Sequence, residues 1–313
     1  MAGTDAAIRT EGLTKHYGDV RALIDLDLEV SLGEVYGFLG PNGSGKTTMI
    51  RTILDEIRPT SGRAWILGLD THRDAYEIRP RIGYVPGDLA LYPNLTGQDT
   101  ITYFANLRGG VEWSYVDELA DRLQADLSKK VGDLSSGNRQ KVGLIQALMN
   151  RPEVLIMDEP STGLDPLMQR EFQTILRDVA AEGRAVFLSS HILSEVQRVA
   201  DRVAIIRRGR LVAVESLQDL RTKALRRVHL ELEAPVEAAT LAGIAGVRDV
   251  TVEGRFAELS FEGKMAGLLR SLAQHHEVVD VSTKEADLDE IFLAYYREDA
   301  SGDEELVEAG AGR

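Results

Sequence analysis

Cysteine is absent from this chain of 313 residues. Its absence excludes disulfide bonds and catalysis by a thiol nucleophile, although it does not fix the cellular compartment. The chain also lacks an uninterrupted apolar stretch of about 18 residues, the length that a membrane-spanning helix needs. The first residues, MAGTDAAIRT, lack a basic segment followed by an apolar one, so we expect no secretory signal there.

Basic residues are fewer than acidic ones. The 36 Lys and Arg and the 50 Asp and Glu give a net charge of −14 at pH 7. A global field of this sign argues against binding to nucleic acid or to anionic lipid surfaces. One basic cluster, Arg207, Arg208 and Arg210, surrounds Gly209, and we interpret it as a hairpin turn at a sheet edge. A chain of this length can hold one large α/β domain and a smaller one, and an apolar content of 43% is enough for their cores.

The segment GPNGSGKTT at residues 40–48 matches G-x-x-x-x-G-K-[ST], the pattern of a phosphate-binding loop. Its glycines let backbone N–H groups wrap phosphate oxygens, and a helix expected at 46–57 points its positive end at the same anion. Lys46 would reach the β- and γ-phosphates, and the Thr47 hydroxyl would bind Mg²⁺. The predicted nucleotide-binding residues here are Gly40, Pro41, Asn42, Gly43, Ser44, Gly45, Lys46, Thr47 and Thr48.

A second segment, VLIMDEP at residues 154–160, joins an apolar run to two carboxylates. The run is typical of a strand buried on both faces of a parallel sheet, and such strands end where ligands bind. We predict that Asp158 holds Mg²⁺ there. Glu159 can polarise an attacking water as a general base, although two acidic residues that only cap the strand are the alternative.

The segment LSSGNRQK, at residues 134–141, lies between these two motifs and precedes a predicted helix, RQKVGLIQALMN. A helix start of this kind binds anions, and one nucleotide held by one chain does not need a second such surface. We therefore interpret it as a cap on the nucleotide of another copy. The alternative is that Ser135 is an ordinary N-cap beside a Gly turn.

With these motifs in this order, the chain resembles the ATP-binding subunits of ABC transporters over roughly residues 8–222. The resemblance implies an α/β fold, a P-loop NTPase (ABC ATPase) core with a helical subdomain, and ATP and Mg²⁺ as cofactors. It assigns Ser135 and Gly137 to the γ-phosphate of the opposite subunit's ATP. The family pattern L-S-G-G-Q is kept at its second and fourth positions, whereas Ser136 and Asn138 depart from it.

Three further residues take roles from the same resemblance. Asp165, in STGLDP, is similar to the aspartate of the loop that joins the two subunits. His191, which ends the apolar strand VFLSSH, would contact the γ-phosphate and help to place the water. Tyr17 resembles the aromatic residue that stacks on adenine. The alternative for His191 is a structural histidine, and the alternative for Tyr17 is an ordinary half-buried aromatic residue of a strand.

Gly87 departs from the family pattern. Aligned on IGYVP, it occupies the position of a glutamine that normally touches Mg²⁺ and the attacking water. Glycine has no side chain for this purpose. Either the adjacent Asp88 substitutes for the glutamine as a metal or water contact, or Gly87 only lends the loop mobility.

Three regions follow from the pattern along the chain. Residues 1–222 are predicted to form the ABC ATP-binding domain, with its helical subdomain at about 88–150, where Thr96 and Asp99 are spaced like a capping box. Residues 223–297 alternate as β-α-β-β-α-β, which favours a small ferredoxin-like α+β accessory domain closed by a helix, ADLDEIFLAYYRE. Residues 298–313 carry six acidic groups and are predicted to be a disordered tail.

The ending of the second domain resembles the accessory domain of ATPases in the drug- and antibiotic-exporter branch. This implies an ATPase that powers a membrane exporter of a drug, antibiotic or other small hydrophobic compound. It would work by ATP-driven dimerisation, as a homodimer. We expect it at the cytoplasmic face of the membrane, with a separate polytopic permease as its partner and with no nucleic-acid partner. The alternatives are a soluble ABC-type ATPase acting on ribosomes or DNA, and a weakly hydrolysing regulatory module; a small-molecule kinase has no use for the loop at 134–141.

Overall fold

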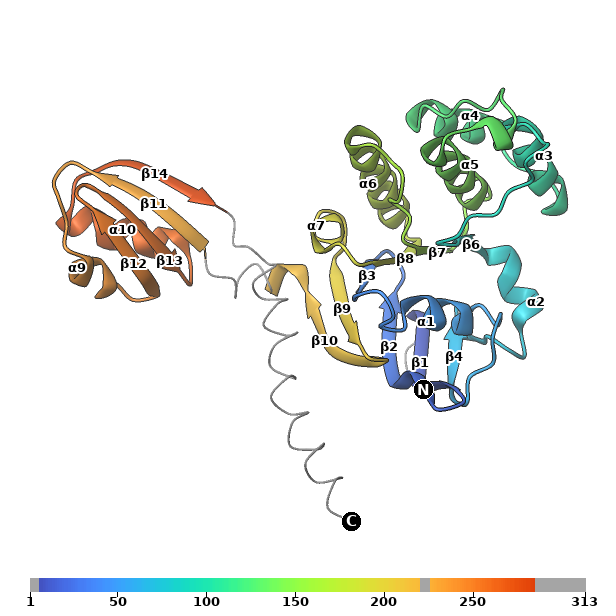
Figure 1. The fold of residues 1–313 in the computed structure, drawn as a ribbon, viewed down its shortest axis with the longest axis horizontal. Coiled ribbons are helices and arrows are strands. Elements are labelled where there is room, and N and C mark those ends of the chain that lie inside the picture. Colours follow the sequence, from blue (N-terminus) through green and yellow to red (C-terminus); the bar gives the residue numbers. More distant parts are fainter. Residues whose placement is uncertain (1–5, 220–225, 285–313) are drawn as a thin grey trace, which may run out of the picture. The chain divides into compact units, whose positions relative to one another are not determined.

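The computed structural model describes residues 6–219 and 226–284, and the chain divides into two compact units between Val214 and Glu215 (Figure 1). The boundary predicted between residues 222 and 223 lies outside the described residues. The predicted closing helix and the acidic tail also lie outside them. Among the described residues, no helix is both long and apolar enough to cross a membrane.

Two sheets form the framework of the first unit. One is antiparallel, with the order β2-β1-β4-β5, and contains β1 (Ala6–Tyr17), β2 (Val20–Ser31), β4 (Ser61–Ile66) and β5 (Leu69–Asp70). The other has the order β10-β9-β3-β8-β7-β6 and contains β3 (Val35–Leu39), β6 (Ile82–Val85), β7 (Val154–Asp158), β8 (Ala185–Ser190), β9 (Arg202–Arg207) and β10 (Arg210–Ser216).

The strands β6, β7, β8, β3 and β9 of the second sheet pair in parallel. Every residue of β3, β7 and β8 is buried. Their near-continuous apolar sequences fit strands covered on both faces, as the sequence predicts for residues 154–157. Consequently the carboxyl ends of β3, β7 and β8 meet at one edge of the sheet.

The helix α1 (Lys46–Ile53) packs between the two sheets. Its residues Met49, Ile50 and Ile53 share one core with apolar side chains from both sheets. The helix is shorter than the predicted 46–57: it ends at Ile53, and Asp55 takes a left-handed φ of 57° that no helix continues through.

Three helices form the region between β6 and β7: α3 (Gly97–Leu107), α4 (Trp113–Arg122) and α5 (Ser136–Leu148), with both α3 and α4 packed on α5. The capping box is confirmed, since Thr96 Oγ1 accepts from Asp99 N and Asp99 accepts from Thr96 N. The remaining elements of the unit are α2 (Ala75–Ile78), the 3₁₀ turns Arg79–Arg81 and Val131–Asp133, α6 (Pro166–Ala181) and α7 (Leu193–Val196).

The predicted hairpin around Gly209 is confirmed at the edge of the second sheet, where it joins β9 to β10. Both turn residues, Arg208 and Gly209, have positive φ, as a tight two-residue turn requires. Gly209 N donates to Ser44 O at 2.9 Å, and Gly209 O accepts from Ile24 N at 2.7 Å. The turn therefore holds the phosphate-binding loop through a backbone hydrogen bond.

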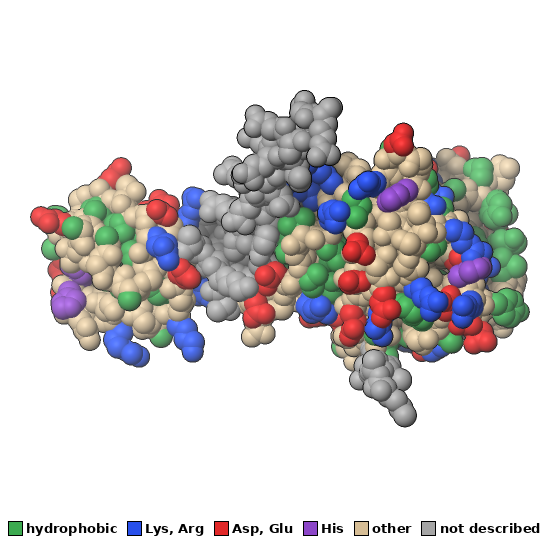
Figure 2. Space-filling model, turned by 90° about the horizontal axis from the view of Figure 1, so that it is seen from below, with side chains coloured by type: hydrophobic (Ala, Val, Ile, Leu, Met, Phe, Trp, Pro, Cys, Tyr) green, Lys and Arg blue, Asp and Glu red, His purple; other side chains and the backbone are tan. Residues whose placement is uncertain are grey.

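On the face shown in Figure 2, acidic and basic side chains lie interspersed.

The second unit has the predicted β-α-β-β-α-β order: β11 (Arg226–Leu232), α9 (Ala238–Ala242), β12 (Val247–Glu253), β13 (Phe256–Phe261), α10 (Met265–His275) and β14 (Val278–Lys284). Its sheet is antiparallel in the order β12-β13-β11-β14, with the first and third strands in the centre, which is ferredoxin-like. Leu241 of α9 and Leu268 and Leu272 of α10 pack on the apolar face of this sheet. The predicted fold class, an α/β core with a small α+β unit, is therefore confirmed.

Candidate active site

The site lies at the carboxyl ends of β3, β7 and β8. Parallel register sets Asp158 beside Ser189 and Leu39 beside Ser190. The segments that leave these strands, at 40–48, 159–165 and 191, therefore start at one edge, where ligands bind in open α/β sheets.

The phosphate-binding loop at 40–48 turns sharply into α1. Gly45, the N-cap of α1, has a φ of 112°, and a Cβ there would lie 2.5 Å from Ala22 O, so only glycine fits. Ser44 Oγ is buried with no hydrogen-bond partner. An unpaired buried hydroxyl at a helix start is an available donor for a phosphate oxygen, which fits the nucleotide predicted for this loop.

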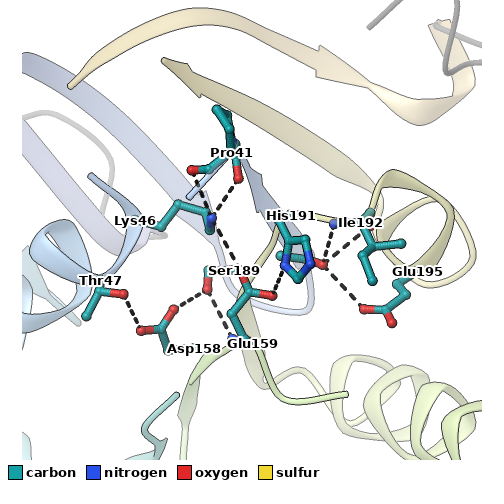
Figure 3. Close-up of polar contacts among 11 residues, drawn as sticks. Pro41, Lys46, Thr47, Asp158, Glu159, Ser189, His191, Ile192 and Glu195 are labelled. Carbon is teal, nitrogen blue, oxygen red and sulfur yellow. Dashed lines mark hydrogen bonds and ion pairs between the residues drawn. The ribbon is translucent and has the colours of Figure 1, made fainter. Parts of the chain in front are cut away.

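Lys46 is buried, with 6% of its side chain exposed. Its Nζ donates to Gly40 O at 2.6 Å and to Pro41 O at 3.3 Å. It also lies 3.3 Å from Glu159 Oε1. The loop carbonyls and one carboxylate thus surround the ammonium group that the sequence assigns to the β- and γ-phosphates (Figure 3).

Asp158 occupies the end of β7 and is 2% exposed. Thr47 Oγ1 donates to Asp158 Oδ2 at 2.7 Å, and Ser189 Oγ donates to Asp158 Oδ1. Thr47 and Asp158 thus offer a hydroxyl and a carboxylate oxygen side by side. Among the described residues no group of three or more His, Cys, Asp or Glu could hold a metal. A pair of oxygen ligands completed by phosphate and water suits Mg²⁺, which fits the predicted pair.

Glu159 links Lys46 and His191, the two nitrogen-bearing side chains of the site. Besides the Lys46 contact of Oε1, its Oε2 lies 2.8 Å from His191 Nδ1 (Figure 3). His191 is 45% exposed, whereas the Glu159 side chain is 21% exposed. The carboxylate therefore bridges two groups assigned to the γ-phosphate, at the point where a water would be activated.

The backbone of Glu159 is strained, with a φ of 50°. A left-handed conformation of a residue other than glycine costs about 1 kcal/mol or more. Glu159 N donates to both Ser189 O and Ser189 Oγ at 3.2 Å, which offsets this cost and holds the backbone at this residue. Strain of this kind is common at functional sites.

A cleft of about 650 Å³ opens beside these groups. Its lining comprises Asn42, Thr47, Arg51, Glu56, Tyr84, Pro86, Gly87, Asp88, Asp158, Glu159, Thr162 and His191. Burial first, and then the negative charges of Glu56 and Asp158, raise the pKa of Tyr84 to about 12, so its hydroxyl stays neutral at physiological pH.

Gly87 faces the predicted magnesium ligand. A side chain at this position would place its Cβ 3.3 Å from Asp158 Oδ2. The position therefore allows a residue to reach the metal site, although glycine offers no ligand there. Asp88 lines the same cleft and is the nearest carboxylate in sequence that could replace the missing side chain.

Contacts described above bring together Lys46, Thr47, Asp158, Glu159 and His191. Neither Tyr17 nor Ser135 is among the residues that line the cleft. Tyr17 is 48% exposed, with Lys15 Nζ 5.0 Å from its ring. A half-exposed ring can accept an adenine, and its role stays a prediction.

Ser135 and Asp165 are both helix N-caps. Ser135 Oγ accepts from Asn138 N at the start of α5, and Asp165 accepts from Leu167 N and Met168 N at the start of α6. The N-cap alternative for Ser135 therefore holds within one chain, and contact with a second nucleotide stays a prediction. Gly137 packs against Gly163, because a Cβ on Gly137 would lie 2.4 Å from Gly163 O.

Ser189 has a role that the sequence analysis did not assign. It is fully buried and contacts both Asp158 and Glu159. The available signal was a polar residue at the end of a buried parallel strand, VFLSSH, next in the sheet to VLIMDEP.

Comparisons with known proteins agree with this geometry. A model of the family described as ABC transporter matches residues 23–162. The daunorubicin resistance ATP-binding protein DrrA3 of Streptomyces coeruleorubidus is 34% identical over 305 residues, which cover 92% of this chain and 95% of that protein. The chain belongs to the ABC transporter family of ATP-binding proteins. Membership makes the first unit an ABC ATPase domain, in a family whose ATPase domains bind ATP and ADP.

Other ABC proteins show a similar likeness. The bacitracin transport ATP-binding protein BcrA of Bacillus licheniformis is 37% identical over 237 residues, covering 75% of this chain and 78% of that protein. A solved ATP-binding subunit of an ABC transporter has a TM-score of 0.63 at 30% identity, covering 69% of this chain and 92% of that one. The dimeric bacterial ABC transporter cassette MJ0796 has a TM-score of 0.62 at 26% identity, covering 67% and 98%.

Because Glu159 contacts both Lys46 and His191, its charge competes with a γ-phosphate. We expect Glu159→Gln to tighten binding of a non-hydrolysable ATP analogue roughly three- to tenfold, the effect of one partly exposed charge pair, and to leave ADP affinity within about twofold. Titration calorimetry on the full-length protein measures both, in the Ser135→Ala background so that dimer formation with the analogue does not add to its affinity. An equal gain for ADP would contradict the competition.

The two interpretations of Gly87 predict different variants. If Asp88 replaces the missing glutamine, Asp88→Asn raises the Mg²⁺ concentration for half-maximal ATP turnover several-fold, because a carboxylate near the metal is lost. Asp121→Asn, on the exposed side of α4, is the matched control. We expect the raised Mg²⁺ requirement in Asp88→Asn, because Asp88 lines the cleft. An unchanged Mg²⁺ dependence, together with slower turnover in Gly87→Ala, would support loop mobility instead.

Proposed function

We propose that this chain is the ATP-binding and ATP-hydrolysing subunit of a membrane exporter for a drug, an antibiotic or another small hydrophobic compound. It works at the cytoplasmic face of the membrane with a separate polytopic permease. The observation that supports this most is the alignment with the daunorubicin resistance protein, which spans 305 residues and so extends past the ATPase unit. The bacitracin transport proteins point to the same class of cargo.

ATP is the substrate that the site fits. The phosphate-binding loop offers the Ser44 hydroxyl, the Lys46 ammonium and the N-terminal end of α1 to the β- and γ-phosphates. Thr47 and Asp158 would hold Mg²⁺, which supplies charge neutralisation on the phosphates when bound. Tyr17 lies near the end of β1 for stacking on adenine.

Hydrolysis requires a water aligned with the γ-phosphorus and a group that takes its proton. Glu159 accepts that proton at its carboxylate as the water oxygen bonds to phosphorus and the bond to the leaving ADP oxygen breaks. His191, 2.8 Å from the same carboxylate, orients it and contacts the transferred phosphoryl group. Lys46 stabilises the negative charge on the phosphoryl oxygens in the transition state.

A second copy completes the site. Ser135 and the first N–H groups of α5 form a helix start that is not part of the lining of the chain's own cleft, and we assign it to the γ-phosphate held by another subunit. Asp165, at the start of α6, lies in the loop that would meet the partner. A γ-phosphate shared in this way favours the closed homodimer, and its loss on hydrolysis opens the dimer. The permease, docked near residues 86–100, converts this cycle into transport.

Glu159→Gln separates ATP binding from hydrolysis. We expect turnover to fall by about a hundredfold or more, because the amide accepts no proton. The variant should form a stable dimer with ATP but not with ADP, as measured by size-exclusion chromatography with light scattering. Ser135→Ala in the same background should weaken that dimer. A Glu159→Gln protein that stays monomeric at saturating ATP would count against the shared-phosphate mechanism.

The permease is the other testable partner. We expect the tagged protein, purified from detergent-solubilised membranes of its native host, to carry a polytopic membrane protein at near-equal stoichiometry, identified by mass spectrometry. The association should persist in Glu159→Gln, which retains the docking surface. Ribosomal or DNA-repair proteins in place of a membrane protein would support the soluble ATPase alternative.

A further inference from the structure

Gln140 makes a buried contact that the proposed mechanism does not use. It lies on α5, five residues after Ser135, and is 8% exposed. Its Nε2 donates to the Pro160 carbonyl at 2.9 Å (20 residues away in sequence). A buried amide is stabilising only when it is hydrogen-bonded, so this bond fixes the side chain's position.

The acceptor is the carbonyl of Pro160, the residue that follows the catalytic carboxylate. Pro160 comes directly after Glu159 and has no N–H of its own, so its carbonyl is the polar group by which it can be held. Glu159 is held on its N-terminal side by the two hydrogen bonds to Ser189. Ser189 and Gln140 therefore hold the strained residue, with its φ of 50°, from opposite sides.

The first turn of α5 also touches the same loop directly. A Cβ on Gly137 would lie 2.4 Å from Gly163 O, and Gly163 itself has a φ of 81°. The two backbones are therefore in contact, with no side chain between them to absorb a displacement. Since close-packed elements move together, a shift of α5 displaces residues 160–163 as well.

We infer that Gln140 is a positioning residue that aligns the Glu159 carboxylate according to where α5 lies. This inference rests on the proposed hydrolysis of ATP at Glu159. Engagement of Ser135 by the nucleotide of the partner subunit moves or fixes α5, and the Gln140–Pro160 hydrogen bond transmits that position to Glu159. The alignment of the Glu159 carboxylate in each subunit thus depends on whether the α5 of that subunit has closed on the ATP of the other subunit.

The test compares two matched variants of the full-length protein. Gln140→Met keeps the side chain's length but removes the donor, and Gln146→Met makes the same change six residues further along α5. For Gln140→Met we expect kcat to fall roughly tenfold, as for the loss of one buried hydrogen bond. Affinity for the non-hydrolysable ATP analogue should stay within about twofold, as should both quantities in Gln146→Met.

A purely structural role for Gln140 predicts a different pattern. It would lower the melting temperature but leave kcat unchanged in the folded protein, and that result would overturn the inference. Gln140→Leu, which removes the donor without burying a charge, replaces Gln140→Met if the latter does not fold. In the Glu159→Gln background, Gln140→Met should change the residual rate by less than about twofold, because the positioned group is already lost.

Failure of the inference and failure of the proposed function remain distinct. Absence of ATP turnover in the unaltered protein, alone and with its permease, would refute the proposed function. Turnover that is equal in the unaltered protein, Gln140→Met and Gln146→Met would refute the role of Gln140 alone.

Discussion

The arrangement of the site depends on one carboxylate held between a lysine ammonium group and a histidine ring. Glu159 lies within 3.3 Å of Lys46 and 2.8 Å of His191, on a backbone that is strained at that residue. The strained backbone is held in place because the Glu159 N–H donates to two oxygens of Ser189. On the other side, Gln140 donates to the carbonyl of Pro160. The partners of Glu159 and Pro160 come from the phosphate-binding loop, from β8 with the residue that follows it, and from α5. This short segment therefore connects all three.

Much of this was predictable because it depends on local sequence. A buried parallel strand must be apolar throughout, and a ligand-binding residue follows where it ends, so VLIMDEP and VFLSSH locate Asp158, Glu159 and His191. The strands at 247–253 and 256–261 alternate apolar and polar residues up to their turns, which fits the β-α-β-β-α-β order predicted for this region. Helix starts at Ser135 and Thr96 follow from capping chemistry.

What could not be predicted depends on neighbours far apart in sequence. Ser189 contacts Asp158 across 31 residues and Gln140 contacts Pro160 across 20, so local sequence names neither partner, although the polar end of VFLSSH marks Ser189 itself. The end of α1 is set by Asp55, whose left-handed backbone no propensity would forecast. The roles of Tyr17 and Ser135 depend on a nucleotide and on a second copy, which no property of one chain determines.

The hairpin turn at Arg208 and Gly209 looks like an ordinary connection at the edge of a sheet. Because Gly209 N donates to Ser44 O, the length of the turn is tied to the phosphate-binding loop, and because a Cβ on Gly209 would lie 2.7 Å from Ala22 O, its glycine is tied to β2. Edge turns usually tolerate inserted residues and tags. This one does not, since a single added residue would withdraw the amide from the loop it supports. Engineered fusions and reporter peptides therefore belong elsewhere on the chain.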